Sequence, residues 1–171
     1  MSEVDHSWHP VRLLDDGRKL ASAACIVFLV SLFLPWYGKS FVPTGTTTFV
    51  KTNISAFGAF TWVEAALLLV DASVLGLLYL RSTGRRVELP AGDGTMIAIA
   101  GGWMVVLLLV RVFDKPTATG GAAATVGLQW GLLLAMAAAG AIVAAGVATR
   151  AIERATKAAA PAARQPDPSA G

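Results

Sequence analysis

Residues 57–80, FGAFTWVEAALLLVDASVLGLLYL, form a long apolar block in which Glu64 and Asp71 are the only charges. A hydrocarbon core about 30 Å thick is crossed by roughly 20 mostly apolar residues in a helix, so this block is long enough to span a bilayer. Lipid offers no hydrogen-bond partners to the backbone, and a helix satisfies its own N–H and C=O groups. A transmembrane β-strand would alternate apolar and polar residues over about ten positions, which this block does not. It therefore predicts a membrane-spanning helix.

Three further blocks of the same kind lie at about residues 20–37, 95–113 and 124–149. We therefore predict an all-α membrane protein, a four-transmembrane-helix bundle over residues 20–149. The N-terminal tail (1–19) and a largely disordered C-terminal tail (150–171) flank it. The hydrophobic fraction is 55% and the charged fraction 15%, against roughly 45–50% and 25% in soluble domains. These values and a mean hydropathy of +0.62 argue against a soluble enzyme and against a wholly disordered chain.

The basic residues are unevenly distributed around these blocks. The two tails and the connection between the second and third blocks carry Arg12, Arg18, Lys19, Arg81, Arg85, Arg86, Arg150, Arg154, Lys157 and Arg164. The other two connections carry only Lys39, Lys51 and Lys115. An even number of spans places both termini on one side, and the positive-inside rule predicts that this side is cytoplasmic. We expect a multi-pass plasma-membrane protein whose positive charge flanks the bilayer, with no nucleic acid as partner.

The connection after the first block, residues 38–56, is the longest and is rich in Thr, Val and Phe. Val42-Pro43-Thr44-Gly45 has the composition of a turn, and residues 46–52 have the β-branched content of a strand. A short β-hairpin over the outer mouth of the bundle is therefore expected.

Glu64 and Asp71 are the most informative polar residues, because they are seven positions apart and share one face of the predicted helix. A carboxylate at the centre of a spanning helix costs about 2.5–3.5 kcal/mol on insertion scales, so such groups usually face the bundle interior. A functional interpretation is a proton or cation pathway, or a polar ligand site. The structural interpretation is that Glu64 pairs with Arg111, and that Asp71 hydrogen-bonds a hydroxyl or an indole such as that of Trp103.

Arg111 is predicted at the outer end of the third helix, at a depth similar to that of Glu64, with Asp114 as a competing partner three residues on. Gln129 enters the fourth block at a comparable level. Glu64, Arg111 and Gln129 are thus candidates for one polar cluster under the outer loop. That cluster is either a structural clamp or a site for an extracytoplasmic or lipid head group.

Aromatic and small residues suggest packing roles. Trp36, Tyr37, Trp62, Phe113 and Trp130 fall near the predicted outer boundary, the depth at which amphipathic rings form an interfacial belt. Gly127 and Gly131 form a GxxxG pair, Ala98 and Gly102 a similar one, and Ala137, Ala141 and Ala145 continue a small-residue stripe. Small residues let helix backbones approach closely, so Gly102, Gly127 and Gly131 are predicted helix-packing positions.

No motif for catalysis or cofactor binding stands out in the sequence. Cys25 is the only cysteine and forms no internal disulfide. His6 and His9 have ligand spacing but no supporting Cys or paired carboxylates, so no metal site is predicted. Phosphate-binding glycine loops, nucleophile elbows and zinc-protease motifs do not occur. We therefore expect neither a cofactor nor an enzyme.

The chain has two short motifs near predicted helix ends, Leu34-Pro35-Trp36-Tyr37 and Arg111-Val112-Phe113-Asp114. With these motifs and its Ala/Val/Gly/Arg-rich composition, it resembles small four-span membrane proteins of high-GC actinobacteria over roughly residues 19–150. The resemblance implies a plasma-membrane location and implies no activity. A claudin-like arrangement is also similar, but that family's paired outer-loop cysteines are absent here, so its function is not carried over.

We interpret the protein as a non-enzymatic accessory or scaffold protein within a larger envelope or transport complex, bound to a membrane-protein partner or to further copies of itself. The alternative is a small transporter or channel subunit that uses Asp71 and Glu64 for proton or cation coupling.

Overall fold

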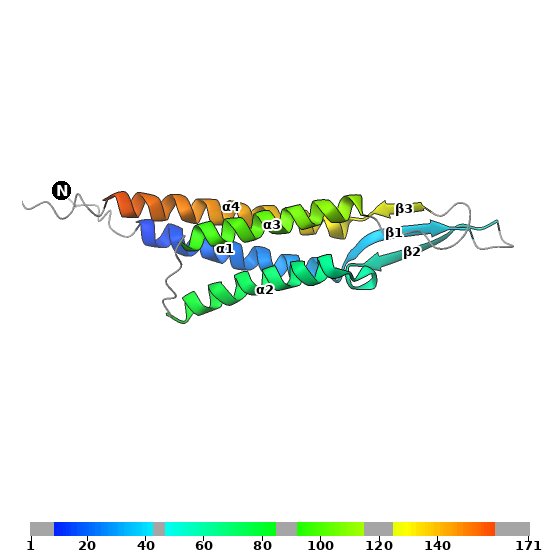
Figure 1. Cartoon of the computed structure of the whole chain (residues 1–171), viewed down its shortest axis with the longest axis horizontal. Helices are drawn as coiled ribbons and strands as arrows, with labels where there is room; N and C mark the ends of the chain where they lie inside the picture. Colours follow the sequence, from blue (N-terminus) through cyan, green and yellow to red (C-terminus); the bar gives the residue numbers. More distant parts are fainter. Residues whose placement is uncertain (1–8, 43–46, 85–91, 115–124, 160–171) are drawn as a thin grey trace, which may run out of the picture.

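The computed structural model describes residues 9–42, 47–84, 92–114 and 125–159. Its four α-helices are α1 (His9–Ser31), α2 (Trp62–Ser82), α3 (Asp93–Phe113) and α4 (Trp130–Ala159). A one-turn 3₁₀ helix, η2 (Phe57–Ala59), precedes α2. The strands are β1 (Pro35–Phe41), β2 (Val50–Ser55) and β3 (Thr125–Leu128). The helices run side by side along the long axis of the molecule, and the strands extend from one end of the bundle (Figure 1).

Three of the helices, α2, α3 and α4, are long and apolar enough to cross a membrane. The predicted first span, residues 20–37, is not a single helix. Helix α1 begins earlier, at His9, and ends at Ser31, so its uncharged helical part runs only from Leu20 to Ser31. The tight i→i+3 bonds of a closing turn follow, such as Leu34 N–H to the Ser31 carbonyl (3.1 Å). Pro35 then starts β1, because a proline has no N–H and disfavours the helical conformation at the residue before it.

The strands form one antiparallel sheet in the order β2-β1-β3. The predicted hairpin is confirmed by the pairing of β1 with β2, from Phe41 opposite Val50 to Pro35 opposite Ser55. Its second strand lies at 50–55 and not at 46–52, and most of the predicted turn lies outside the described residues. The third strand, β3, was not predicted. It takes up residues 125–128, which the sequence assigned to the fourth helix, so α4 begins only at Trp130.

Helix α4 is the centre of the bundle, packing against both α3 and α1, while α2 makes fewer contacts with α1 and α3. Glycines bring α3 and α4 into backbone contact. A Cβ on Gly94 would meet the backbone of Arg150, one on Gly101 the backbone of Val143, and one on Gly146 the backbone of Ala98. Close approach of this kind is how small residues hold helices together where the surroundings are apolar.

The first described helix begins and the last described helix ends at the same end of the bundle. The start of α1, the end of α2, the start of α3 and the end of α4 all lie away from the sheet (Figure 1). Arg81 is in the last turn of α2, and Arg18 and Arg150 lie beside the first turn of α3, so all three are toward that end, as the predicted charge distribution requires. Lys39 and Lys51 lie on the sheet at the other end. The cytoplasmic side of the bundle stays a prediction, based on the distribution of Lys and Arg.

Candidate functional site

Glu64 is set in place by the start of its own helix. Thr61 is the N-cap of α2, and its hydroxyl accepts from Val63 N–H (3.3 Å). The Glu64 carboxylate reaches back, and its Oε2 accepts from Thr61 N–H (2.7 Å) and from Thr61 Oγ1 (2.5 Å). This is the reciprocal arrangement of a capping box, which satisfies N–H groups that the first turn of a helix leaves open.

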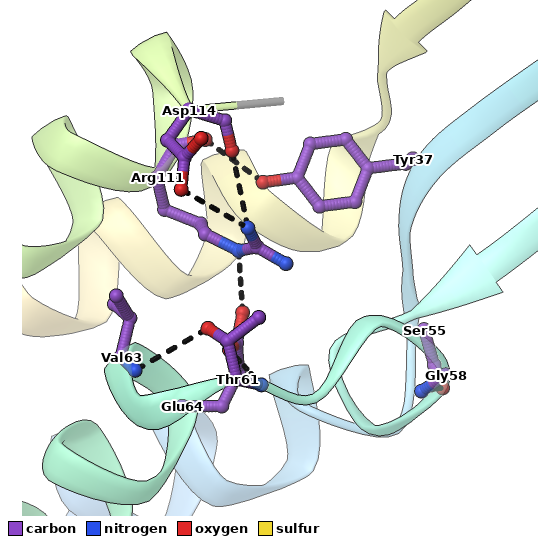
Figure 2. A network of polar contacts seen from close by, with 8 residues as sticks. All are labelled: Tyr37, Ser55, Gly58, Thr61, Val63, Glu64, Arg111 and Asp114. Carbon is purple, nitrogen blue, oxygen red and sulfur yellow. Dashed lines mark hydrogen bonds and ion pairs between the residues drawn. The ribbon is translucent and has the colours of Figure 1, made fainter. Parts of the chain in front are cut away.

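The other carboxylate oxygen of Glu64 holds Arg111, near the C-terminal end of α3. Arg111 Nε donates to Glu64 Oε1 over 2.5 Å (Figure 2). The two side chains are only 3% and 1% exposed. Arg111 Nη1 also donates to the main-chain carbonyl of Asp114 (3.1 Å), whose carboxylate lies 4.0 Å away. The predicted Glu64–Arg111 pair and the predicted contact with Asp114 are both confirmed.

Tyr37 of β1 completes this group. Its hydroxyl donates to the Arg111 carbonyl (2.9 Å; Figure 2), and the guanidinium lies over its ring, with Cζ of Arg111 5.4 Å from the ring centroid. Burial raises the pKa of Tyr37 to about 12, although the positive charge of Arg111 acts in the opposite direction. The phenol thus stays protonated and can donate at physiological pH. We call Tyr37, Glu64 and Arg111 the sheet-end cluster, because they join the sheet to α2 and α3.

Gln129, the third predicted member of the cluster, is placed elsewhere. Its main-chain N–H donates to the Trp36 carbonyl (2.8 Å), and its side-chain amide lies where a Cβ on Gly38 would be. It helps to line a polar hollow of about 220 Å³ on the sheet, together with Lys39 and Lys51. Tyr37, and not Gln129, joins Glu64 and Arg111 in the polar cluster. Sequence reasoning missed Tyr37 because the predicted helix over 20–37 put its ring in the bilayer interface.

Asp71 lies two turns further along α2 and is completely buried. Neither of its carboxylate oxygens makes a hydrogen bond of regular geometry among the described residues, although the buried thiol of Cys25 on α1 lies beside it. The predicted bond to Trp103 does not form, since that indole lies on an exposed face of α3 (55% exposed). The structural interpretation, in which Asp71 bonds a hydroxyl or an indole, therefore does not explain why this carboxylate is buried.

The predicted interfacial aromatics divide into two groups. Trp62, Trp130 and Phe113 are exposed on the helices, so their place in an interfacial belt stays a prediction. Trp36 and Tyr37 are fully buried, and for them the belt assignment is wrong. The Trp36 indole donates to the Ser31 carbonyl (2.8 Å). A shift of register between Pro35 and Tyr37 marks a bulge, which re-aims neighbouring side chains and allows both rings to turn inward.

The predicted packing glycines also divide. Gly131 does make a close approach, because a Cβ there would meet the Pro35 carbonyl at 2.6 Å, but its neighbour is the start of β1 and not another helix. Gly102 and Gly127 have open space around them, so the packing role predicted for them is wrong within this chain. Gly127 lies in β3, and on α3 the neighbouring Gly101 makes the close approach to α4. Both helices are rich in small residues on several faces, so spacing alone does not select the right one.

Sequence reasoning also missed a second ionic group at the opposite end of the bundle. Asp93, in the first turn of α3, binds Arg81 of α2 (2.6 Å) and Arg18 of α1 (3.3 Å). We call Arg18, Arg81 and Asp93 the far-end cluster. Close by, Glu153 of α4 accepts from Gly94 N–H (3.3 Å), which places a carboxylate at the N-terminus of α3. The signal in the sequence was an acidic residue just before the apolar block at 95–113.

Among the described residues, no group of three or more His, Cys, Asp or Glu side chains is placed to hold a metal ion. No family model matches the chain, and no curated protein resembles it significantly in sequence. The site therefore has to be interpreted from its own geometry.

Proposed function

We propose that this protein is a non-enzymatic membrane accessory protein that presents a small sheet, at a fixed position over its helices, to a partner in a larger envelope or transport complex. The observation that carries the proposal is the sheet-end cluster. Tyr37 of β1 is bonded to Arg111 of α3, and Arg111 is bonded to Glu64 of α2. The sheet is thereby tied to two helices through buried polar contacts.

The bonding of Glu64 favours a structural role for this cluster over a transport role. One carboxylate oxygen is taken by Arg111 and the other by Thr61. A group that exchanges protons or cations needs a coordination position that opens during the cycle. Releasing Glu64 would leave both it and Arg111 buried without their partner, which costs several kcal/mol.

The sheet itself offers a surface for a partner. Strands β2 and β3 are its two edges, and most of their residues are exposed. An open edge presents unpaired backbone groups to which an extended segment of another chain can add as a strand. We place the partner on the longer edge, β2, and a second copy of this chain is one form that such a partner can take.

Site-specific cross-linking in cells tests this proposal. With Cys25 replaced by Ser, a photo-reactive probe is attached at Thr52→Cys on β2 or, as matched control, at the exposed Thr83→Cys at the opposite end. We expect a defined adduct from position 52 and none from position 83. Adding Arg111→Met, which removes the polar link between the sheet and α2, is expected to abolish that adduct while the protein remains in the membrane. Equal labelling from both positions would overturn the proposal.

Asp71 supports the second candidate, a transporter or channel subunit. It is completely buried, with the thiol of Cys25 beside it and no hydrogen bond of regular geometry to its carboxylate oxygens among the described residues. Intramembrane carboxylates of this kind often belong to ion pathways. For this function, Asp71→Asn should abolish proton flux in liposomes while the protein stays folded. For the accessory function, neither the wild type nor Asp71→Asn should conduct protons beyond the lipid background.

A further inference from the structure

A groove lies between α1 and α2 at the end of the bundle away from the sheet. Its volume is about 610 Å³. Three cationic side chains, Arg18, Lys19 and Arg81, line it together with the apolar Ala23, Ile26 and Leu78. Neither proposed function uses this groove, whose lining residues on α2 (Leu78, Arg81 and Ser82) lie at the opposite end of that helix from Glu64.

The charge of the groove is positive. Arg18 and Arg81 share one counter-ion, Asp93, which is almost completely buried behind them. Lys19 adds a third cation, and no carboxylate is among the described residues that line the groove. Arginine presents several donors in a planar fork that matches the oxygens of a phosphate. The arrangement therefore suits a phosphate monoanion better than a neutral or cationic ligand.

The groove changes from polar to apolar along the helix axes. Arg18 and Lys19 lie near the middle of α1, just before its uncharged part, and Arg81 lies at the end of α2. Ile26 lies about 12 Å beyond Arg18 along α1, as the helical rise of 1.5 Å per residue gives. Ile26 is 56% exposed, so it faces the surroundings of the bundle and not its core. A ligand that lies along this groove would meet cations at one end and hydrocarbon at the other.

We infer that this groove binds an anionic phospholipid from the leaflet at that end of the bundle. The headgroup phosphate lies between Arg18, Lys19 and Arg81, and an acyl chain follows Ala23 and Ile26 of α1 and Leu78 of α2. Basic pockets between membrane helices bind anionic headgroups by this physical combination of charge and apolar wall. The site does not depend on which partner the sheet engages.

Native mass spectrometry of the full chain in detergent tests the inference, with phosphatidylglycerol or phosphatidylcholine added at equal concentration. We expect one phosphatidylglycerol per chain to be retained in preference to phosphatidylcholine. Lys19→Gln, at an exposed position, should weaken retention about fivefold, since one basic residue near a lipid surface contributes about 1 kcal/mol. Ser82→Asp, which brings a negative charge to the groove and removes no cation, should weaken it at least as much.

The matched control is Arg154→Gln, which removes an exposed cation of α4 at the same end of the bundle but outside the groove. It should leave retention unchanged. Equal retention of the two lipids, or equal losses for Arg154→Gln and Lys19→Gln, would overturn the inference in favour of diffuse surface charge. Displacement of the lipid by millimolar glycerol 3-phosphate would likewise overturn it, because the headgroup alone would then be the ligand. Far-UV circular dichroism checks that each variant is folded.

Discussion

The two ends of the bundle each join α2 and α3 through an ionic group, but in different surroundings. At the sheet end, Arg111 and Glu64 are 3% and 1% exposed, and Tyr37 closes the group. At the far end, Asp93 is 8% exposed, but its partners Arg81 and Arg18 are 18% and 37% exposed, so this group is partly open to its surroundings. A buried pair has to be satisfied completely, because an uncompensated buried charge is costly, whereas water screens an exposed pair. One end is therefore fixed, and the other can accommodate a ligand.

The largest effect is expected from breaking the sheet-end pair. Arg111→Met leaves the Glu64 carboxylate buried without its cation and should lower the free energy of unfolding by about 3–5 kcal/mol. Unfolding in detergent micelles measures this loss. The double variant Glu64→Gln, Arg111→Met should recover most of it, since no unpaired charge remains. If the double variant is as unstable as the single one, packing and not charge explains the loss.

The contact of α3 with α4 lies between the two clusters and should come next. Gly101→Val places a side chain against the backbone of Val143 and should destabilise the protein by about 1–3 kcal/mol. The neighbouring Gly102 has open space around it, so Gly102→Ala should be neutral or slightly stabilising because alanine favours the helix. Thermal unfolding of both variants measures the two changes in stability. Equal destabilisation at positions 101 and 102 would contradict the observed packing face.

A smaller effect is expected at the far end. Asp93→Asn removes the shared counter-ion of Arg18 and Arg81 and should cost about 1–2 kcal/mol, because these groups are partly solvated. The loss should shrink in high salt, because the Debye length falls from about 10 Å at 0.1 M to about 3 Å at 1 M, so that partly exposed charges are screened more strongly. Chemical unfolding at 50 mM and 1 M NaCl measures it. A salt-independent loss would show that the two ends do not differ as we describe.

Tyr37→Phe should have the smallest effect, a loss of about 1 kcal/mol for one hydrogen bond at neutral pH. The pKa of Tyr37 is raised by burial to about 12 in the folded state, above the value of about 10 of an unperturbed tyrosine. The folded state therefore holds this proton more tightly, so its contribution is complete below pH 10 and is lost as the pH rises toward 12. Unfolding measured from pH 8 to 12 should show a steeper decline for wild type than for Tyr37→Phe. Parallel curves would contradict a buried phenol.

Part of the sheet-end cluster followed from sequence. Charges in an apolar block have few ways to be satisfied, so Glu64 and Arg111 were predictable as partners. Asp93 was not predictable as the partner of Arg18 and Arg81, because a charge near a helix end can also be satisfied by water or by other neighbours. Tyr37 was missed for another reason: its position depends on where α1 ends, and the apolar run from Leu20 to Tyr37 contains no charged residue to mark that end, only Ser31 and Pro35.

The amino-acid sequence by itself determined the helical character of the apolar blocks, the hairpin after the first of them and the Glu64–Arg111 pair, because each depends on local composition or on the cost of a charge in an apolar segment. Tertiary structure decided that β3 joins β1 as a third strand, that Gly101 and not Gly102 meets α4, and that Trp36 and Tyr37 turn inward. Those outcomes depend on contacts between segments far apart in the chain. The packing of the whole molecule selects these contacts, because several short runs of small or β-branched residues in the sequence are similar enough to have made them.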